Sequence, residues 1–173
     1  MTTESPAPAG SPRPRSVAEL LLSAYASILA ELRRCGVVRS GESPLADYAA
    51  WLVARALGGT LARTVSERPW DLLLPNGRRV QVEALVLADR PTGDQLCTAP
   101  SHSWDFDLGA FVLFRDRDYW VYRAALVPRE ALRVAARPVQ HVGGWRVQLS
   151  PALLGHPDAE DLSERLRAAA GAA

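Results

Sequence analysis

The chain has 173 residues, 48% of them hydrophobic, and a formal net charge of +1 at pH 7. A chain of this length and composition can form one domain with a sizeable core, and its near-neutral charge excludes a protein that is basic over its whole surface. Any nucleic-acid-binding surface must therefore be local. All 20 basic residues counted as Lys or Arg are arginines, so no mechanism here can use a catalytic lysine.

Targeting and redox features predict a cytoplasmic protein that does not enter membranes. No apolar run approaches the roughly 18 residues of a membrane span, and the N-terminus lacks an apolar signal core. Cys35 and Cys97 stand alone without paired spacing. Isolated cysteines of this kind are typical of reduced thiols in the cytoplasm.

The N-terminal part is predicted to hold a tail and a helix. Residues 1–15 are rich in Pro and Ser and are expected to be disordered, whereas residues 16–170 are expected to form one domain. Ser16 and Glu19 have the spacing of a capping box, which predicts a helix that continues to about Arg34. Apolar residues follow one face of this helix.

A second helix is predicted from Ser43 and Pro44 to the glycine pair that begins at Gly58, because proline suits the first helical position and glycine the end. Asp47 and Ala50 lie three residues apart in it. They therefore share one face of the helix, apart from its apolar stripe.

Later segments alternate between short apolar runs and turns, which indicates an α/β (α+β) domain with one central mixed β-sheet flanked by helices. The apolar run at 110–114 predicts a strand buried on both faces, and residues 89–105 predict a long irregular connection. The predicted strands are 60–65, 70–74, 78–87, 110–114, 119–127 and 145–149, and the predicted later helices are 129–136 and 158–169.

The segment from Trp70 to Leu87 reads as one β-hairpin around the turn Pro75-Asn76-Gly77. A three-residue loop with glycine in the left-handed position places residue 71 opposite residue 81. Residue 83 then points to the same side, because side chains alternate along a strand. The hairpin therefore predicts a cluster of Asp71, Gln81 and Glu83 on one face of the sheet.

Two acids and an amide on one strand face, with another acid on a nearby helix, suit a hard divalent cation such as Mg²⁺. The expected ligands are Asp71, Gln81 and Asp47. Such an ion stabilises phosphodiester displacement and lowers the pKa of the attacking water. The alternative from the residues alone is that Asp71 and Glu83 are solvent-facing residues of an edge hairpin.

The chain resembles the PD-(D/E)xK, or restriction endonuclease-like, superfamily, and more closely an uncharacterised actinobacterial group of that fold. The resemblance spans about residues 16–169, although no single short motif is highly specific. The segments that carry it are 30–34 with 36–39, 47–49 with 51–54, 66–71, 77–82, 105–107 before the strand at 111–114, and 141–145.

The resemblance implies roles for four positions. Asp71 lies where the motif has its metal-binding Asp, and Gln81 takes the (D/E) place, which is Gln in this group. The motif lysine is replaced by Glu83, and the helix glutamate is replaced by Ala50, with Asp47 one turn away as a substitute. The expected catalytic residues are thus Asp71, Gln81 and Glu83, in a degenerate motif.

These departures leave three functions open. The expected one is a degenerate nuclease-fold protein, catalytically weak or inactive, that binds DNA or a partner protein. The second is an active Mg²⁺-dependent endonuclease that uses Glu83 in place of the lysine. The third is a protein-interaction subunit, as a homodimer or with another protein, that does not bind nucleic acid.

Candidate DNA-contacting residues flank this cluster. Arg78 and Arg79 follow the turn and could bind phosphate, although charged residues beside a turn are usually only solvated. His102 lies in the long polar connection and is a further candidate. Trp104 has two readings, contact with a nucleic-acid sugar or base and closure over the core.

Overall fold

The computed structural model describes residues 16–40, 43–62, 69–88 and 96–171. The predicted tail, residues 63–65 of the first predicted strand and the first part of the long connection lie outside these ranges. Five helices are described, namely α1 (Val17–Arg34), α2 (Pro44–Leu57), α3 (Arg129–Ala135), α4 (Pro151–Leu154) and α5 (Ser163–Gly171). The strands are β1 (Thr60–Leu61), β2 (Leu72–Leu73), β3 (Arg79–Leu87), β4 (Leu108–Arg115), β5 (Val121–Pro128), β6 (Ala136–Val139), β7 (Gly144–Val147) and β8 (Glu160–Asp161).

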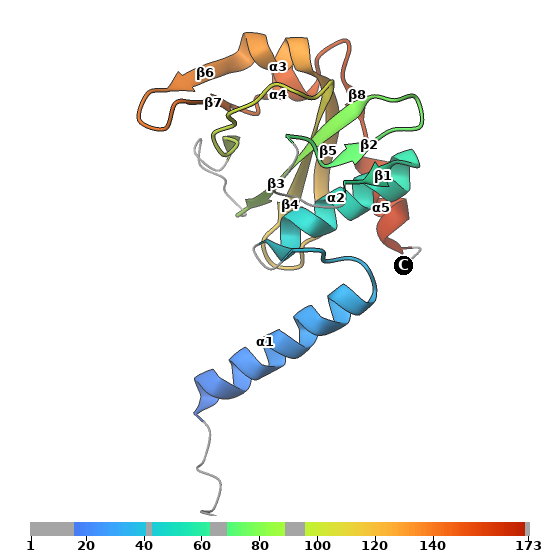
Figure 1. The fold of residues 1–173 in the computed structure, drawn as a ribbon, viewed down its shortest axis with the longest axis vertical. Helices are drawn as coiled ribbons and strands as arrows, with labels where there is room; N and C mark the ends of the chain where they lie inside the picture. Colours follow the sequence, from blue (N-terminus) through green and yellow to red (C-terminus); the bar gives the residue numbers. More distant parts are fainter. Residues whose placement is uncertain (1–15, 41–42, 63–68, 89–95, 172–173) are drawn as a thin grey trace, which may run out of the picture.

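Six of these strands form one mixed sheet in the order β1-β2-β3-β4-β5-β8 (Figure 1). The β3–β4 pair is parallel, and the other pairs are antiparallel. Strand β4 is buried along nearly its whole length, as its unbroken apolar run predicts. The predicted class, a central mixed sheet flanked by helices, is confirmed.

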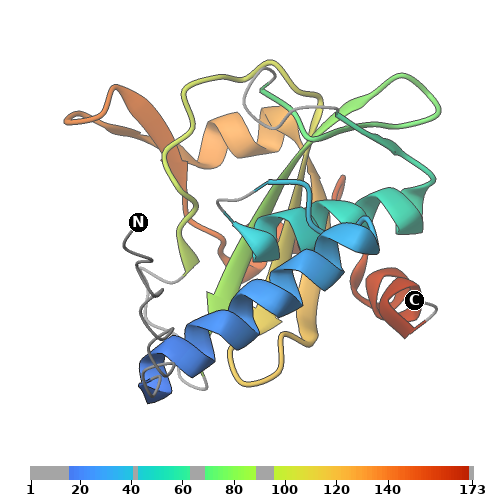
Figure 2. The same ribbon diagram turned by 60° about the horizontal axis from the view of Figure 1, so that its bottom comes forward.

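Helices cover both faces of the sheet (Figure 2). One core packs α2 and α5 against the face of β3 that carries Val80 and Val82. The other core lies between the opposite face and α3 and α4, and includes Phe106 and Phe111. Because residues 81 and 83 alternate with 80 and 82, the predicted cluster belongs to the second face.

Helix α1 stands apart from both cores. It begins at the predicted capping box, in which the Ser16 hydroxyl accepts the Glu19 N–H and the Glu19 carboxylate accepts the Ser16 N–H. None of its residues is buried by the described part of the chain, and it extends away from the sheet in Figure 1. Among the described helices, none is both long and apolar enough to cross a membrane.

Strands β6 and β7 form a separate two-stranded hairpin that projects from the domain (Figure 1). The predicted strand at 145–149 overlaps β7, but β6 was not predicted, because Pro138 indicates only the end of the preceding helix. Pro138 is tolerated here because a two-stranded ribbon has only edge strands. Ser101 pairs with Trp145 and Cys97 with Gln148, so the end of the long connection is fastened to this hairpin.

Candidate functional site

The hairpin that carries the predicted cluster has the predicted register. Leu72 lies opposite Val80 and Leu73 opposite Arg79, and the Leu74 N–H donates to the Arg78 carbonyl at 2.9 Å. Gly77 has φ +82°, the left-handed conformation that a three-residue loop requires. The same register continued by one residue places position 71 opposite position 81.

The Asp71 carboxylate continues the hydrogen bonding of β3 at the point where the pairing of β3 with β2 ends. Its Oδ2 accepts the Val82 N–H at 2.6 Å, and its backbone N–H donates to the Val80 carbonyl at 2.8 Å. Burial raises the pKa of Asp71, an effect that the Val82 N–H and the nearby Arg39 charge oppose and the Asp47 charge reinforces. This carboxylate is therefore partly occupied by the backbone that it stabilises.

Glu83 lies on the same face, in a more apolar setting. Burial first, and then the neighbouring Asp71 charge, raise its pKa from 4.5 to about 7. Gln81 and Glu83 line one small cavity of about 30 Å³, which is room for about one water molecule. The aromatic walls include Trp104, which packs against Phe106 with ring centroids 5.8 Å apart. Of the two readings for that tryptophan, closure over the core is the one observed.

Asp47 of α2 comes close enough for its charge to raise the pKa of Asp71, but its carboxylate is bound by Arg39 and Ser40 of the preceding loop. Its side chain is 3% exposed, and its Oδ2 accepts the Arg39 N–H at 2.9 Å, the Ser40 N–H at 2.6 Å and the Ser40 hydroxyl at 2.9 Å. Its Oδ1 lies 3.5 Å from the Arg39 guanidinium, which also donates to the Ala62 carbonyl. The result is a clamp between residues 39–40 and α2, which sequence reasoning missed.

The helix position where the family pattern expects glutamate is part of the core. Ala50 is buried among the apolar residues that join α2 to the sheet. A glutamate side chain at this position would lie among the apolar residues of that core, where burying its charge is costly. Asp47, one turn away, is therefore the one acid of α2 near the cluster.

A cation at this cluster would have to share its ligands with other partners. Asp47 already accepts three hydrogen bonds, Asp71 accepts one from the backbone, and Glu83 is close to half protonated at neutral pH. Within the described ranges, no three Asp, Glu, His or Cys side chains are grouped as metal ligands. These carboxylates therefore do not form a preorganised Mg²⁺ site, and magnesium binding stays a prediction.

The predicted DNA-contacting residues lie in different settings. Arg79 is paired with Asp105 and Asp107, and it holds the pKa of Asp107 below its usual range, first through the Arg79 backbone N–H. Arg78 is exposed. His102 is also exposed, and its ring lies beside Gly144 at the start of β7.

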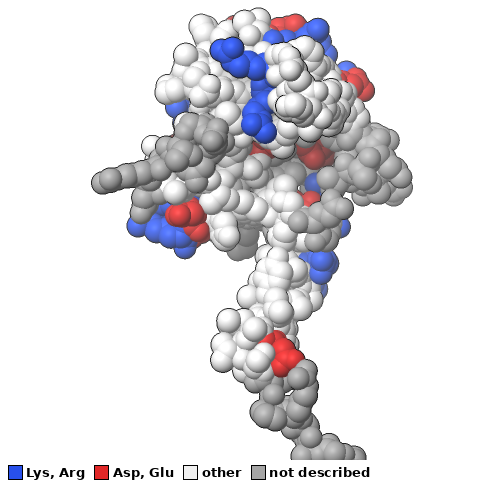
Figure 3. All heavy atoms as spheres, turned by 90° about the vertical axis from the view of Figure 1, so that its left-hand side faces the viewer, with Lys and Arg blue, Asp and Glu red and all other residues white. Residues whose placement is uncertain are grey.

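The β6–β7 hairpin carries a pair of exposed arginines that sequence reasoning missed. Arg137 of β6 lies directly opposite Arg146 of β7, and both are exposed. Neither guanidinium has an acidic partner among the described residues, and residues 131–157 contain no Asp or Glu. Figure 3 looks onto the side from which the hairpin projects, and arginine side chains gather at the top of that view. The absence of Asp and Glu from residues 131–157 was the sequence signal for this basic surface.

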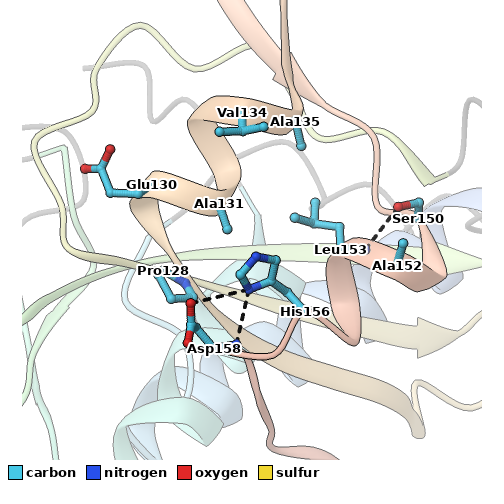
Figure 4. A pocket seen from close by; sticks show the side chains of 10 residues that line it. All are labelled: Pro128, Glu130, Ala131, Val134, Ala135, Ser150, Ala152, Leu153, His156 and Asp158. Carbon is cyan, nitrogen blue, oxygen red and sulfur yellow. Dashed lines mark hydrogen bonds and ion pairs between the residues drawn. The ribbon is translucent and has the colours of Figure 1, made fainter.

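A larger hollow of about 500 Å³ lies between α3 and α4, away from the predicted cluster (Figure 4). Its lining is mostly small and apolar. His156 Nδ1 accepts the Asp158 N–H at 3.2 Å, so the imidazole is used to hold its own loop. The hollow brings together no predicted site residue.

Comparisons with known proteins add no further constraint. No protein-family model matches the chain, and no curated protein is significantly similar to it. The relationship to the PD-(D/E)xK superfamily therefore stays a resemblance, and any function must be argued from the geometry above.

Proposed function

We propose that this protein is a catalytically inactive member of the restriction endonuclease-like fold that binds DNA through its β6–β7 hairpin. The observation that carries the proposal is the exposed Arg137–Arg146 pair on an acid-free ribbon. Like charges directly opposite on neighbouring strands repel each other, so the pair costs stability in the free protein. A phosphate bound between the two guanidiniums relieves that repulsion, and this relief adds to the free energy of binding.

The shape of the element favours duplex DNA. A two-stranded β-ribbon fits the major groove of B-form DNA, whereas the major groove of A-form RNA is too deep and narrow for it. On the other ribbon face, Trp145 and Val147 belong to the lining that includes Gln81 and Glu83. The hairpin is therefore held against the domain while its arginine face remains open.

The carboxylate cluster supports the inactive part of the proposal. The motif lysine is replaced by a glutamate with a raised pKa, the helix glutamate is replaced by a buried alanine, and the substitute acid Asp47 is held by the Arg39–Ser40 loop. The mixed sheet and the placement of Asp71 opposite Gln81 support descent from a nuclease fold. Activity with Glu83 acting as the base is the second candidate, and a subunit that contacts only protein is the third.

DNA binding can be measured by fluorescence anisotropy with a labelled duplex over a series of salt concentrations. We expect the double variant Arg137→Ala, Arg146→Ala to bind roughly 10- to 100-fold more weakly and to lose about two units of the slope of log affinity against log salt. The control Arg117→Glu changes the net charge by the same amount at the exposed β4–β5 turn and should bind nearly as the parent does. Absence of parent binding at low salt would favour the protein-interaction subunit.

Cleavage is tested with supercoiled plasmid and Mg²⁺ or Mn²⁺. We expect no nicking by the parent beyond that of Asp71→Ala, because the cluster lacks both the lysine and an available helix acid. Nicking by the parent that Asp71→Ala abolishes would establish the active-endonuclease alternative instead. Glu83→Lys restores the expected lysine, and metal-dependent nicking gained by this variant alone would locate the ancestral site at Asp71.

A further inference from the structure

The tip of the β6–β7 hairpin is a turn, residues 140–143, that is exposed along its whole length. Its side chains are those of Gln140, His141 and Val142, and Val142 is 49% exposed. The hairpin projects from the domain, and the tip is the part of it that lies farthest from the central sheet (Figures 1 and 2). An amide and an apolar side chain at the end of a projecting ribbon can enter a groove that is too narrow for the domain itself.

Hydrogen bonds hold this turn and the strand behind it in one conformation. The Gly143 N–H donates to the Val139 carbonyl at 3.1 Å, and Gly143 has φ +64°, the left-handed conformation that favours glycine. Directly behind the turn, Trp145 and Ser101 exchange two backbone hydrogen bonds of 2.8 Å each. A Cβ atom on Gly144 would lie 2.9 Å from the Ser101 carbonyl, so this close approach requires glycine. The tip is therefore preorganised, which lowers the entropic cost of binding.

The distance from the arginine pair to the tip matches the depth of a DNA groove. Val139 and Gly144, the last pair of the ribbon, lie two residues beyond Arg137 and Arg146. At about 3.4 Å per residue this is about 7 Å, and the turn extends farther. The major groove of B-form DNA is about 8.5 Å deep and about 12 Å wide. With the two arginines at the phosphates along the edge of the groove, the tip therefore reaches the base edges.

We propose that the tip reads A·T base pairs in the major groove, with the Gln140 amide hydrogen-bonded to adenine and Val142 packed against the thymine methyl group. The inference rests on the proposed DNA binding and adds a sequence preference to it. Adenine presents an acceptor and a donor that together complement an amide, and thymine presents a methyl group in this groove. One A·T pair offers both partners, whereas a G·C pair offers no methyl group.

The arginines and the tip should leave different signatures in binding measurements. Arg137 and Arg146 hold phosphates, which are the same in every sequence, so they set the affinity and its salt dependence. Gln140 and Val142 are uncharged and contact bases, so they set the ratio of affinities for different sequences. The two contributions can therefore be separated in one assay.

Fluorescence anisotropy with three duplexes of equal length tests the proposal. The probes are alternating A·T pairs, the same duplex with uracil in place of thymine, and alternating G·C pairs. Uracil removes the methyl group from the major groove and leaves the minor-groove acceptors unchanged. We expect the parent to bind the A·T duplex about fourfold more tightly than the uracil duplex, the ratio for one buried methyl group, and about 10-fold more tightly than the G·C duplex.

Single substitutions assign these preferences to the tip. Val142→Ala should bind the thymine and uracil duplexes nearly equally, and Gln140→Ala should lose most of the preference for A·T over G·C pairs. Both variants should keep the parent's salt slope, because neither removes a charge. The matched controls are Val134→Ala, at an exposed position on α3, and Gln148→Ala, at an exposed position just after β7, and both should keep the parent's preferences.

The outcomes separate this inference from the proposed function. Equal affinity of the parent for all three duplexes would overturn the sequence preference and leave DNA binding by the hairpin standing. Preferences that both tip variants retain would overturn the assignment to Gln140 and Val142. Failure of the parent to bind any of the three duplexes at low salt would overturn the inference and the proposed function together.

Discussion

Asp47→Ala is expected to destabilise the domain by about 3–5 kcal/mol, the cost of breaking a buried charged pair by removing one partner. The substitution would leave the Arg39 and Ser40 N–H groups and the Arg39 guanidinium without their acceptor. Among the described residues, the Arg39 Nε is buried without a hydrogen-bond partner, and the guanidinium would keep its hydrogen bond to the Ala62 carbonyl as compensation. Chemical denaturation at neutral pH measures the change in the free energy of unfolding.

Two further substitutions separate this structural role from a metal-binding role. Asp47→Asn keeps one carbonyl acceptor and should lose less stability than Asp47→Ala. Asp116→Ala removes an exposed acid from the β4–β5 turn and should change stability by less than about 0.5 kcal/mol. If Asp47→Ala retained the parent's stability and lost only a metal-dependent property, Asp47 would be a ligand and the clamp would be incidental.

Glu83→Gln is expected to stabilise the domain at pH 8 and to remove part of its pH dependence. Glu83 has a pKa of about 7 in the folded chain against an ordinary value of 4.5. Between these two values the folded state holds a proton that the unfolded state has lost, so stability falls as the pH rises through this window. The full difference is on the order of 3 kcal/mol at 1.36 kcal/mol per pKa unit.

The measurement is the free energy of unfolding from pH 4.5 to pH 8. The parent should lose stability toward pH 8, and Glu83→Gln should have a flatter profile because its amide cannot ionise. Asp71 acts in the same direction, since burial also raises its pKa, so some slope should remain. The control Glu130→Gln changes an acid whose side chain is 71% exposed and should keep the parent's slope. Equal slopes in all three proteins would contradict the burial of Glu83.

Local sequence signals were sufficient for the hairpin and for the buried strand. The Pro-Asn-Gly turn fixes a register within a few residues, which is why the pairing of Leu72 with Val80 could be predicted. The apolar run at 110–114 similarly defines β4. The N-cap of α1 is also local, because Ser16 and Glu19 satisfy each other's backbone groups.

Features that depend on distant partners could not be read in this way. The engagement of Asp47 requires the chain to fold back from α1 onto α2, and nothing in the spacing of residue 39 and residue 47 requires that. The Arg137–Arg146 pair depends on β6, a strand containing proline, which local propensity assigns to a helix end. The exposure of the apolar face of α1 is likewise a tertiary property, since the same pattern fits a buried helix.

The parallel pairing of β3 with β4 has a consequence for folding on the ribosome. The described end of the connection between these strands is held by Thr98, whose N–H donates to the Val147 carbonyl at 2.9 Å and whose hydroxyl accepts the Val147 N–H at 3.0 Å. A nascent chain whose residue 147 has not yet left the ribosome cannot form these two hydrogen bonds. Until translation passes that point, Trp145 and Val147 are missing from the cavity that Glu83 lines. The burial that raises the pKa of Glu83 is therefore incomplete until the β6–β7 hairpin has emerged.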